Sequence, residues 1–173
     1  CTSDVDIYAV GDAVQIKNMV TGKDTLFALA GPANKQGRIA ADNICGINSV
    51  YAGGEGSSVI KVFSLTCAFT GLNSAAAKEA GYDSDSVILF SANHATYYPG
   101  ARNMTLKVIF DKKSGKILGA QAVGYDGVDK RIDVLAVAIK AGMTAYGLQE
   151  LDLCYAPPYS STKDPVNMAG YAI

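Results

Sequence analysis

Residues 106–123 read LKVIFDKKSGKILGAQAV. Alternate residues from 106 to 110 are apolar, which places them on one face of an extended strand. The lysine-rich centre contains Ser114-Gly115, a combination typical of a turn, and a second apolar run occupies 117–123. The stretch therefore predicts two antiparallel strands, 106–111 and 117–123, joined by a short turn.

The elements around this hairpin predict a complete small fold. Between Asp129 and Ala141 apolar residues recur at the spacing of one helix face, and Gly142 follows as a typical C-terminal residue. The shorter expected elements are strands at 59–65 and 86–91, helices at 73–80 and 145–151, an extended loop at 155–159, and a last helix that Asp164 caps and Pro165 starts. Together they predict the fold class α+β, with an antiparallel sheet of about five strands and helices on one face.

The first part of the chain has a different pattern. The run 6–10 is short, apolar and partly β-branched, which predicts a buried strand, and a helix is expected at 33–45 after a polar loop. One strand, one loop and one helix leave their apolar faces uncovered, so this part does not make a whole domain. The glycine-rich stretch 53–58 predicts a linker, which divides the chain into residues 1–50 and 57–173. Since the chain starts without a methionine, we expect it to be a fragment.

Composition argues against several classes of protein. The 173 residues are 49% hydrophobic and 18% charged, as in a globular protein, and no apolar stretch approaches the ~20 residues of a membrane helix. The formal net charge of −1 gives no general field for nucleic acid. The four cysteines lie far apart, without CxxC or Cys/His spacing, so we expect no metal site, reduced thiols and a cytoplasmic location.

Few residues indicate chemistry by themselves. The single histidine, His94, has no neighbouring carboxylate in the sequence, which favours a loop residue without a catalytic task. Tyrosine is frequent, with 10 residues, and two clusters, Tyr97-Tyr98 and Tyr155 to Tyr159, lie in loops bounded by proline. A phenol can hydrogen-bond or protonate a leaving anion, and it can equally fill a subunit interface. Both interpretations remain open on this pattern.

Three stretches carry a resemblance to a known family. YAVGDA at 8–13 and LAGPANKQGR at 29–38 are similar to the late FAD-binding segment of the pyridine nucleotide-disulfide oxidoreductases. YAPPYSSTKDPVNMAG at 155–170 resembles the branch of coenzyme A-disulfide reductases and NADH oxidases. The resemblance implies that residues 1–50 are a remnant of an α/β FAD-binding domain. It also implies that residues 57–173 are the C-terminal interface domain through which these enzymes form homodimers.

The same resemblance implies a redox enzyme that uses FAD, with NADH or NADPH as co-substrate and coenzyme A disulfide or a related small disulfide as substrate. None of the four cysteines matches the family's redox cysteine. We therefore expect that the chain alone is inactive and does not retain FAD.

The resemblance also assigns flavin contacts. Asp12, within Gly11-Asp12-Ala13, matches the aspartate that accepts a hydrogen bond from a flavin ribityl hydroxyl. The segment Ala28-Leu29-Ala30 matches one whose backbone approaches the flavin ring, although relatives often have proline where Ala28 stands.

Two tyrosines and a lysine carry the implied substrate chemistry. Tyr97 and Tyr155 match the tyrosines that, in coenzyme A-disulfide reductases, reach into the partner subunit's active site and assist departure of the coenzyme A thiolate. Lys163 matches a position near the bound coenzyme A, where an ammonium would attract phosphate. Tyr98 is the alternative to Tyr97, and Tyr159 is the alternative to Tyr155.

Two hypotheses of different classes follow. In the first, the chain is the C-terminal part of an FAD-dependent coenzyme A-disulfide reductase, with an NADH oxidase or a polysulfide reductase of the same family as the alternative. In the second, the chain is a stand-alone module that dimerises without chemistry.

Overall fold

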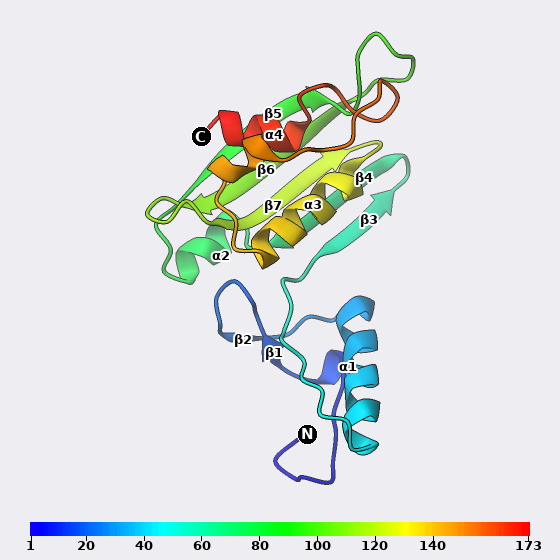
Figure 1. Cartoon of the computed structure of the whole chain (residues 1–173), viewed down its shortest axis with the longest axis vertical. Coiled ribbons are helices and arrows are strands. Elements are labelled where there is room, and N and C mark those ends of the chain that lie inside the picture. Colours follow the sequence, from blue (N-terminus) through cyan, green and yellow to red (C-terminus); the bar gives the residue numbers. More distant parts are fainter. The chain divides into compact units, whose positions relative to one another are not determined.

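A computed structural model describes residues 1–173, which form two compact units, residues 1–56 and residues 57–173 (Figure 1). Each unit is described by itself below. The larger unit contains the predicted hairpin, and the smaller unit contains the segments whose sequence resembles a flavin-binding region.

The larger unit is built on one antiparallel sheet with the strand order β3-β4-β7-β6-β5. Its strands are β3 (Ser58–Val62), β4 (Leu65–Gly71), β5 (Ser84–Ala92), β6 (Asn103–Asp111) and β7 (Ile117–Gly124). The predicted hairpin is confirmed, because β6 pairs with β7 in antiparallel register. The five strands with their helices confirm the α+β fold class.

One strand of this sheet was not predicted. The expected strand 59–65 is present as β3, but the chain turns at Phe63 and Ser64 and returns as the unpredicted strand β4. Phe63 is not a usual turn former, yet it adopts a φ of 52°, the positive value that a two-residue hairpin needs at its first central position. Without a glycine or asparagine there, the sequence offers no signal that the chain reverses.

Two helices cover one face of the sheet. The helix α3 (Val128–Lys140) packs on β4 and β7, and α4 (Pro165–Tyr171) packs near β5; Figure 1 shows both lying across the same side. Asp164 caps α4 by accepting a hydrogen bond from the Val166 N–H at 3.0 Å, as predicted, with Pro165 at the first helical position. The core between helices and sheet includes fully buried Leu106 and Leu135.

The opposite face of the sheet is only partly covered. The short helix α2 (Ser74–Glu79), capped by Asn73 as predicted, lies over one end of it, where Ser74 accepts a hydrogen bond from Lys107 of β6 at 2.7 Å. Gly119 permits this crossing, because a Cβ there would lie 2.0 Å from the Leu72 carbonyl oxygen. Beyond α2 the face exposes large apolar side chains, namely Ile60, Phe69, Ile88, Phe90 and Val123.

The expected helix at 145–151 is a 3-10 helix, η2 (Tyr146–Glu150).

The smaller unit has little regular structure besides one helix. Its elements are the 3-10 helix η1 (Gly11–Ala13), the two-residue strands β1 (Ile16–Lys17) and β2 (Asp24–Thr25), and the helix α1 (Ala30–Ile44). The helix begins before the predicted residue 33, since Pro32 is tolerated in a first turn, where the N–H is not needed. It ends before Gly46, which has a positive φ of 80°.

The predicted strand at 6–10 is wrong. The segment carries no strand, and nothing in the chain pairs with it. An extended run needs a neighbouring ladder to become a strand, because its N–H and C=O groups have no partners within the run. Its apolar side chains accordingly stay accessible, with Ile7 54% and Val10 42% exposed.

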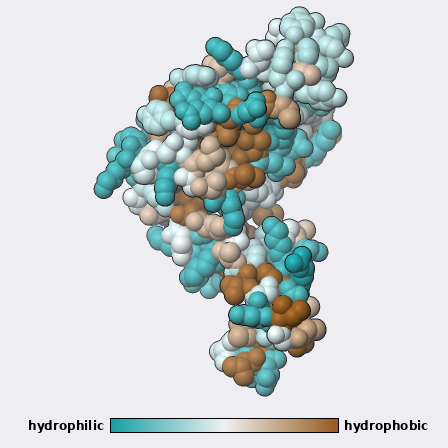
Figure 2. Space-filling model, viewed as in Figure 1, coloured by the Kyte–Doolittle hydropathy of each residue, from teal (hydrophilic) through white to brown (hydrophobic).

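The surface of the smaller unit is rich in apolar side chains. Figure 2 shows brown side chains on the unit that ends at Gly56, and the large exposed ones are Val5, Ile7, Val10, Leu26, Ile44, Ile47 and Val50. No helix in the structure has the length and apolar character that crossing a membrane requires.

Candidate functional site

Two tyrosines from distant parts of the chain meet in the larger unit. The hydroxyl groups of Tyr97 and Tyr155 lie 3.1 Å apart, within hydrogen-bond distance, and either can be the donor. Tyr97 comes from the loop between β5 and β6, and Tyr155 from the loop between η2 and α4. Both phenols are accessible, with Tyr97 76% and Tyr155 45% exposed. The pair can therefore present its oxygens to a ligand.

The alternatives to these tyrosines lie differently. The ring of Tyr98 stands edge-on to His94, with 5.9 Å between the ring centroids. Tyr159 is 71% exposed and its carbonyl oxygen faces Arg131 at 3.4 Å. Of the four candidates, only Tyr97 and Tyr155 share a hydroxyl contact.

The loop that carries Tyr97 is closed at its base and along its length. Asn93 and Arg102 bond to each other through their backbones and through the Asn93 side chain, which accepts from the Arg102 N–H at 2.9 Å. The His94 Nε2 lies 3.3 Å from the Pro99 carbonyl oxygen, so His94 closes a turn inside the loop. The prediction that His94 is a loop residue agrees with this placement, although its side chain is buried at 8% exposure.

The loop that carries Tyr155 is joined to the first loop by backbone bonds. The Ala95 N–H lies 3.3 Å from the Pro157 oxygen and 3.0 Å from the Ser160 oxygen. The expected extended loop contains a turn at 157–159, where the Tyr159 N–H donates to the Ala156 oxygen at 2.9 Å. Proline in this segment disfavours a helix, and the Pro157 and Ser160 carbonyl oxygens accept from the neighbouring loop.

The electrostatics of the pair keep a proton on Tyr155. The hydrogen bond with Tyr97 raises the pKa of the Tyr155 phenol above its ordinary value, and burial and the neighbouring phenol's charge add to the effect. Ionising Tyr155 would break the bond that it donates. At neutral pH this phenol is therefore a hydrogen-bond and proton donor.

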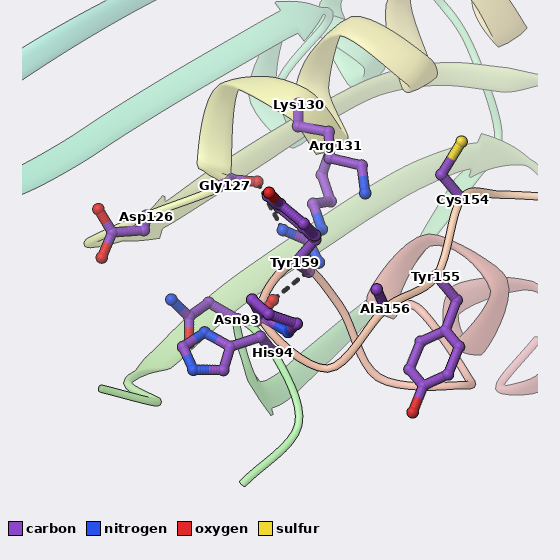
Figure 3. A pocket seen from close by; sticks show the side chains of 11 residues that line it. Asn93, His94, Asp126, Gly127, Lys130, Arg131, Cys154, Tyr155, Ala156 and Tyr159 are labelled. Carbon is purple, nitrogen blue, oxygen red and sulfur yellow. Dashed lines mark hydrogen bonds between the residues drawn. The ribbon is translucent and has the colours of Figure 1, made fainter. Parts of the chain in front are cut away.

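A cavity of about 620 Å³ lies beside Tyr155 (Figure 3). Arg131 of α3 extends into its wall, where the guanidinium donates to the carbonyl oxygens of Gly127 at 3.0 Å and Asn93 at 2.9 Å. The cavity is lined by Asn93, His94, Asp126, Gly127, Lys130, Arg131, Cys154, Tyr155, Ala156, Pro158 and Tyr159.

The guanidinium of Arg131 forms a buried ion pair with Asp164, with 2.9 Å between Nη2 and Oδ2. Burial raises the pKa of the Asp164 carboxyl, but hydrogen bonds from Ser160 and from the Val166 N–H, together with the Arg131 charge, outweigh it and leave the pKa below its ordinary value. Asp164 is therefore a carboxylate at neutral pH.

The residues matched to flavin contacts come together in the smaller unit. The Gly11 N–H donates to Gln36 of α1 at 2.7 Å, and a Cβ on Gly11 would lie 3.9 Å from that of Ala33. Gly11-Asp12-Ala13 thus lies against the first turns of α1, and Ala28-Leu29-Ala30 leads into the same helix end. Asp12 is exposed, and no side chain caps α1. An exposed carboxylate beside an uncapped helix start suits a ligand that has both hydroxyl donors and acceptor oxygens.

Other candidates are not part of the tyrosine pair. Lys163 holds its ammonium 5.8 Å from the centroid of the Tyr171 ring, and no hydrogen bond joins it to Tyr97 or Tyr155. The four cysteines are free thiols, and no group of three metal-ligating side chains occurs.

Sequence reasoning missed the buried pair of Arg131 and Asp164. Arg131 lies on the same helix face as Ile132 and Leu135, so a charge on the buried side of α3 was the available signal. Asp164 was expected only as a helix cap, which it is, but it also holds the guanidinium.

Comparison with known proteins identifies relatives of both units. The family profile described as "Pyridine nucleotide-disulphide oxidoreductase, dimerisation domain" matches residues 57–165, which is more than half of the chain. The coenzyme A disulfide reductase of Staphylococcus haemolyticus is 38% identical over 96% of this chain and 38% of its own length.

Two solved structures share the fold closely. The reduced CoADR-RHD of Bacillus anthracis is 54% identical, with a TM-score of 0.94 over 98% of this chain and 31% of that one. A NAD-dependent persulfide reductase from A. fulgidus is 47% identical, with a TM-score of 0.95 and the same coverage. The chain thus spans about two fifths of the first relative and less than a third of these two structures.

Proposed function

Since the chain belongs to the pyridine nucleotide-disulphide oxidoreductases, whose dimerisation domain it contains, we propose that the whole protein is an FAD-dependent NAD(P)H:disulfide oxidoreductase. Its proposed substrate is coenzyme A disulfide or a related small disulfide, its proposed state is a homodimer, and its proposed location is the cytoplasm. The names of the relatives support this assignment. The single observation that carries it is the hydrogen-bonded pair of Tyr97 and Tyr155.

The pair supplies what disulfide reduction needs at the departing sulfur. Cleavage of a disulfide by two electrons releases two thiolates, and each must gain a proton to leave as a thiol. The Tyr155 phenol carries its proton at neutral pH, as a tyrosine ordinarily does, so its hydroxyl can donate to that sulfur. Tyr97 can hold the Tyr155 hydroxyl in position for this donation, because the two oxygens lie 3.1 Å apart. We propose that this pair serves the active site of the partner subunit.

The smaller unit is proposed to be the last part of the flavin-binding domain, covering residues 1–50, with residues 57–173 as the interface domain. When bound, FAD would carry electrons from NADH or NADPH to the disulfide. Asp12 would accept a hydrogen bond from a ribityl hydroxyl, and the backbone of Ala28-Leu29-Ala30 would face the flavin ring. The exposed carboxylate next to the uncapped start of α1 fits these roles. The remaining apolar surface of this unit fits a domain of which the chain holds a part.

Substitution of the two tyrosines in the full-length protein tests the proposal. We expect Tyr155→Phe and Tyr97→Phe each to lower turnover with coenzyme A disulfide, by about 10²-fold for the general-acid contribution. Reduction of the flavin by NADH or NADPH should stay unchanged, since it does not involve this proton. Tyr146→Phe is the matched control, because Tyr146 is also an exposed tyrosine, 52% accessible, and lies in η2. Full turnover in both variants would contradict the proposal.

A persulfide reductase is the second candidate, because the A. fulgidus enzyme of that name is 47% identical. Product analysis separates the candidates. Free thiol from coenzyme A disulfide supports the first, sulfide from a persulfide supports the second, and peroxide or water from oxygen with neither sulfur product would indicate an NADH oxidase.

A further inference from the structure

We propose that Arg131 is a positioning residue, whose guanidinium sets the distance between the loops that carry Tyr97 and Tyr155. The geometric role concerns this chain alone, and its consequence for turnover rests on the proposed function. The inference starts from a buried charge that the reaction itself does not use.

Arg131 is 1% exposed, which is rare for a charged side chain, because an unpaired charge is strongly disfavoured away from water. Its donors are correspondingly satisfied. Nε and Nη2 both bond Asp164, at 3.1 and 2.9 Å to Oδ2, in a two-pronged arrangement. Nη1 donates to the Gly127 oxygen at 3.0 Å and Nη2 also to the Asn93 oxygen at 2.9 Å. Longer contacts reach Tyr159 and Ser160.

These partners belong to the two tyrosine loops. Asn93 follows β5 directly and opens the loop that contains Tyr97. Tyr159, Ser160 and Asp164 follow Tyr155 in the other loop. One planar group on α3 thus bonds both loops (Figure 3), and the Ala95 N–H also joins them to each other.

The distance between the phenols depends on this arrangement. At 3.1 Å the two oxygens lie just beyond the usual range of about 2.5–3.0 Å for an O–H···O bond, and a separation of about 3.6 Å is not a hydrogen bond. Both side chains are exposed, so surrounding packing does not hold their hydroxyls together. A small separation of the loops is enough to uncouple the pair.

Arginine suits this task and lysine does not. The guanidinium has five N–H donors in a rigid plane, which lets it bond a carboxylate and two carbonyl oxygens in fixed directions. A lysine keeps the charge opposite Asp164 but cannot reach all three partners with a single ammonium.

Gly127 gives a second, independent way to disturb the guanidinium. A Cβ at this position would lie 2.2 Å from Nη1, and the residue has a φ of 72°. Nη1 therefore occupies the space that a side chain at position 127 would fill. Gly127→Ala would displace the guanidinium without altering its charge or that of Asp164.

The test measures how strongly the two tyrosines are coupled in the full chain. Tyrosines labelled with ¹³C at Cζ are titrated by NMR, with Tyr155→Phe to assign the signal. In the native protein, Tyr97→Phe should lower the pKa of Tyr155, because it removes the hydrogen bond that raises it. We expect this effect of Tyr97→Phe to shrink toward zero in an Arg131→Lys background and in a Gly127→Ala background. Asp133→Asn, an exposed charge change on the same helix, should leave the effect at its native size.

Far-UV circular dichroism reports whether each variant folds. An intact coupling in folded Arg131→Lys or folded Gly127→Ala would overturn the positioning role. Failure of both variants to fold would also overturn it, since Arg131 would then be a residue of stability alone.

Activity of the full-length protein separates this inference from the proposed function. Arg131→Lys should lower turnover with coenzyme A disulfide by up to about 10²-fold, as small misplacements of reacting groups do. It should add little to Tyr155→Phe, and flavin reduction by NADH or NADPH should not change. If Tyr155→Phe has full turnover while Arg131→Lys still uncouples the tyrosines, the proposed function fails and the positioning role stands. The reverse result, coupling intact and turnover lost in Tyr155→Phe, leaves the function and removes Arg131 from it.

Discussion

The helices α1 and α3 are nearly equal in length, with 15 and 13 residues, yet they differ greatly in what they bury. Within the smaller unit α1 buries Gln36 alone, whereas α3 in the larger unit buries six side chains: Val128, Arg131, Ile132, Leu135, Ala138 and Ile139. Helices in proteins gain most of their stability from packing rather than from their own hydrogen bonds. The larger unit therefore has a core that its own helix helps to form, whereas α1 gains little from packing within the smaller unit.

This difference extends to chemistry. The tyrosine pair is completed by side chains of the larger unit, which hold it through buried contacts. The residues proposed to contact flavin lie on a unit with few buried side chains. The predictions below test whether free energy of unfolding is concentrated in the larger unit.

Loss of the buried carboxylate should have the largest effect. Asp164→Ala leaves Arg131 as an unpaired buried charge, and breaking such a pair costs about 3–5 kcal/mol. Urea unfolding followed by circular dichroism measures the free energy of unfolding. A loss below about 1 kcal/mol, the range of surface pairs, would contradict the assigned burial.

Acid provides a control for this substitution. Because the pKa of folded-state Asp164 lies below the ordinary value of 3.8, the carboxylate stabilises the fold above that pH. This contribution should be lost as the pH falls from about that value through the folded-state pKa, since the folded form binds the proton less readily than the unfolded form. Asp164→Asn should remove this part of the pH dependence of stability. If the acid unfolding transition of Asp164→Asn equals that of the native protein, the lowered pKa of Asp164 is contradicted.

Truncation in the core of the larger unit comes next. Leu135 lies on the buried face of α3 and is fully buried. Leu135→Ala should therefore lower the free energy of unfolding by about 2–5 kcal/mol, through lost burial and the cavity that remains. Val137→Ala on the same helix removes a side chain that is 69% exposed and should change stability by less than about 0.5 kcal/mol. Val50→Ala in the smaller unit, 80% exposed, should behave like Val137→Ala.

The strained hairpin tip should give a smaller effect of opposite sign. Phe63 has a φ of 52° and is 98% exposed, so Phe63→Gly relieves strain without removing packing. We expect a gain of about 1 kcal/mol, less the entropy that glycine adds to the unfolded chain. In the smaller unit, Gly22→Ala places a Cβ at a φ of 68°. It should leave the main unfolding transition unmoved, and a shift comparable to that of Phe63→Gly would break the comparison between the units.

The smallest effect is expected at the ion pair of the smaller unit. Lys17 and Asp24 approach to 2.7 Å, but their side chains are 62% and 55% exposed. Lys17→Gln should cost no more than about 1 kcal/mol, and added salt should reduce that cost. A cost near that of Asp164→Ala, measured in the same urea experiment, would show that the smaller unit is as tightly built as the larger.

Local signals predicted the parts of the fold that depend on near neighbours. The hairpin β6–β7 was predicted because its alternation and its turn residues lie within one stretch, and α4 because Asp164 and Pro165 mark a helix start. The strand β4 was missed because Phe63, which takes the positive φ of the turn, is not a typical turn residue. The predicted strand at 6–10 failed because no other segment of the chain pairs with it.

The candidate site shows the same limit. Tyr97 and Tyr155 are 58 positions apart, and no spacing rule links them, so only the resemblance suggested the pair. Arg131 and Asp164 are 33 positions apart, and their contact depends on how α3 and α4 dock on the sheet. Contacts of this kind follow from the assembled fold rather than from local sequence.

The separation of Arg131 from its carboxylate has a consequence for synthesis on the ribosome. The arginine is translated 33 residues before Asp164. In that interval a guanidinium on the buried side of α3 has no carboxylate, and burying it would cost several kcal/mol. We therefore expect the nascent helix to dock stably only after Asp164 has been made. A chain that stalls between the two residues would present the apolar face of α3 to chaperones and proteases, which would recognise it as unfinished.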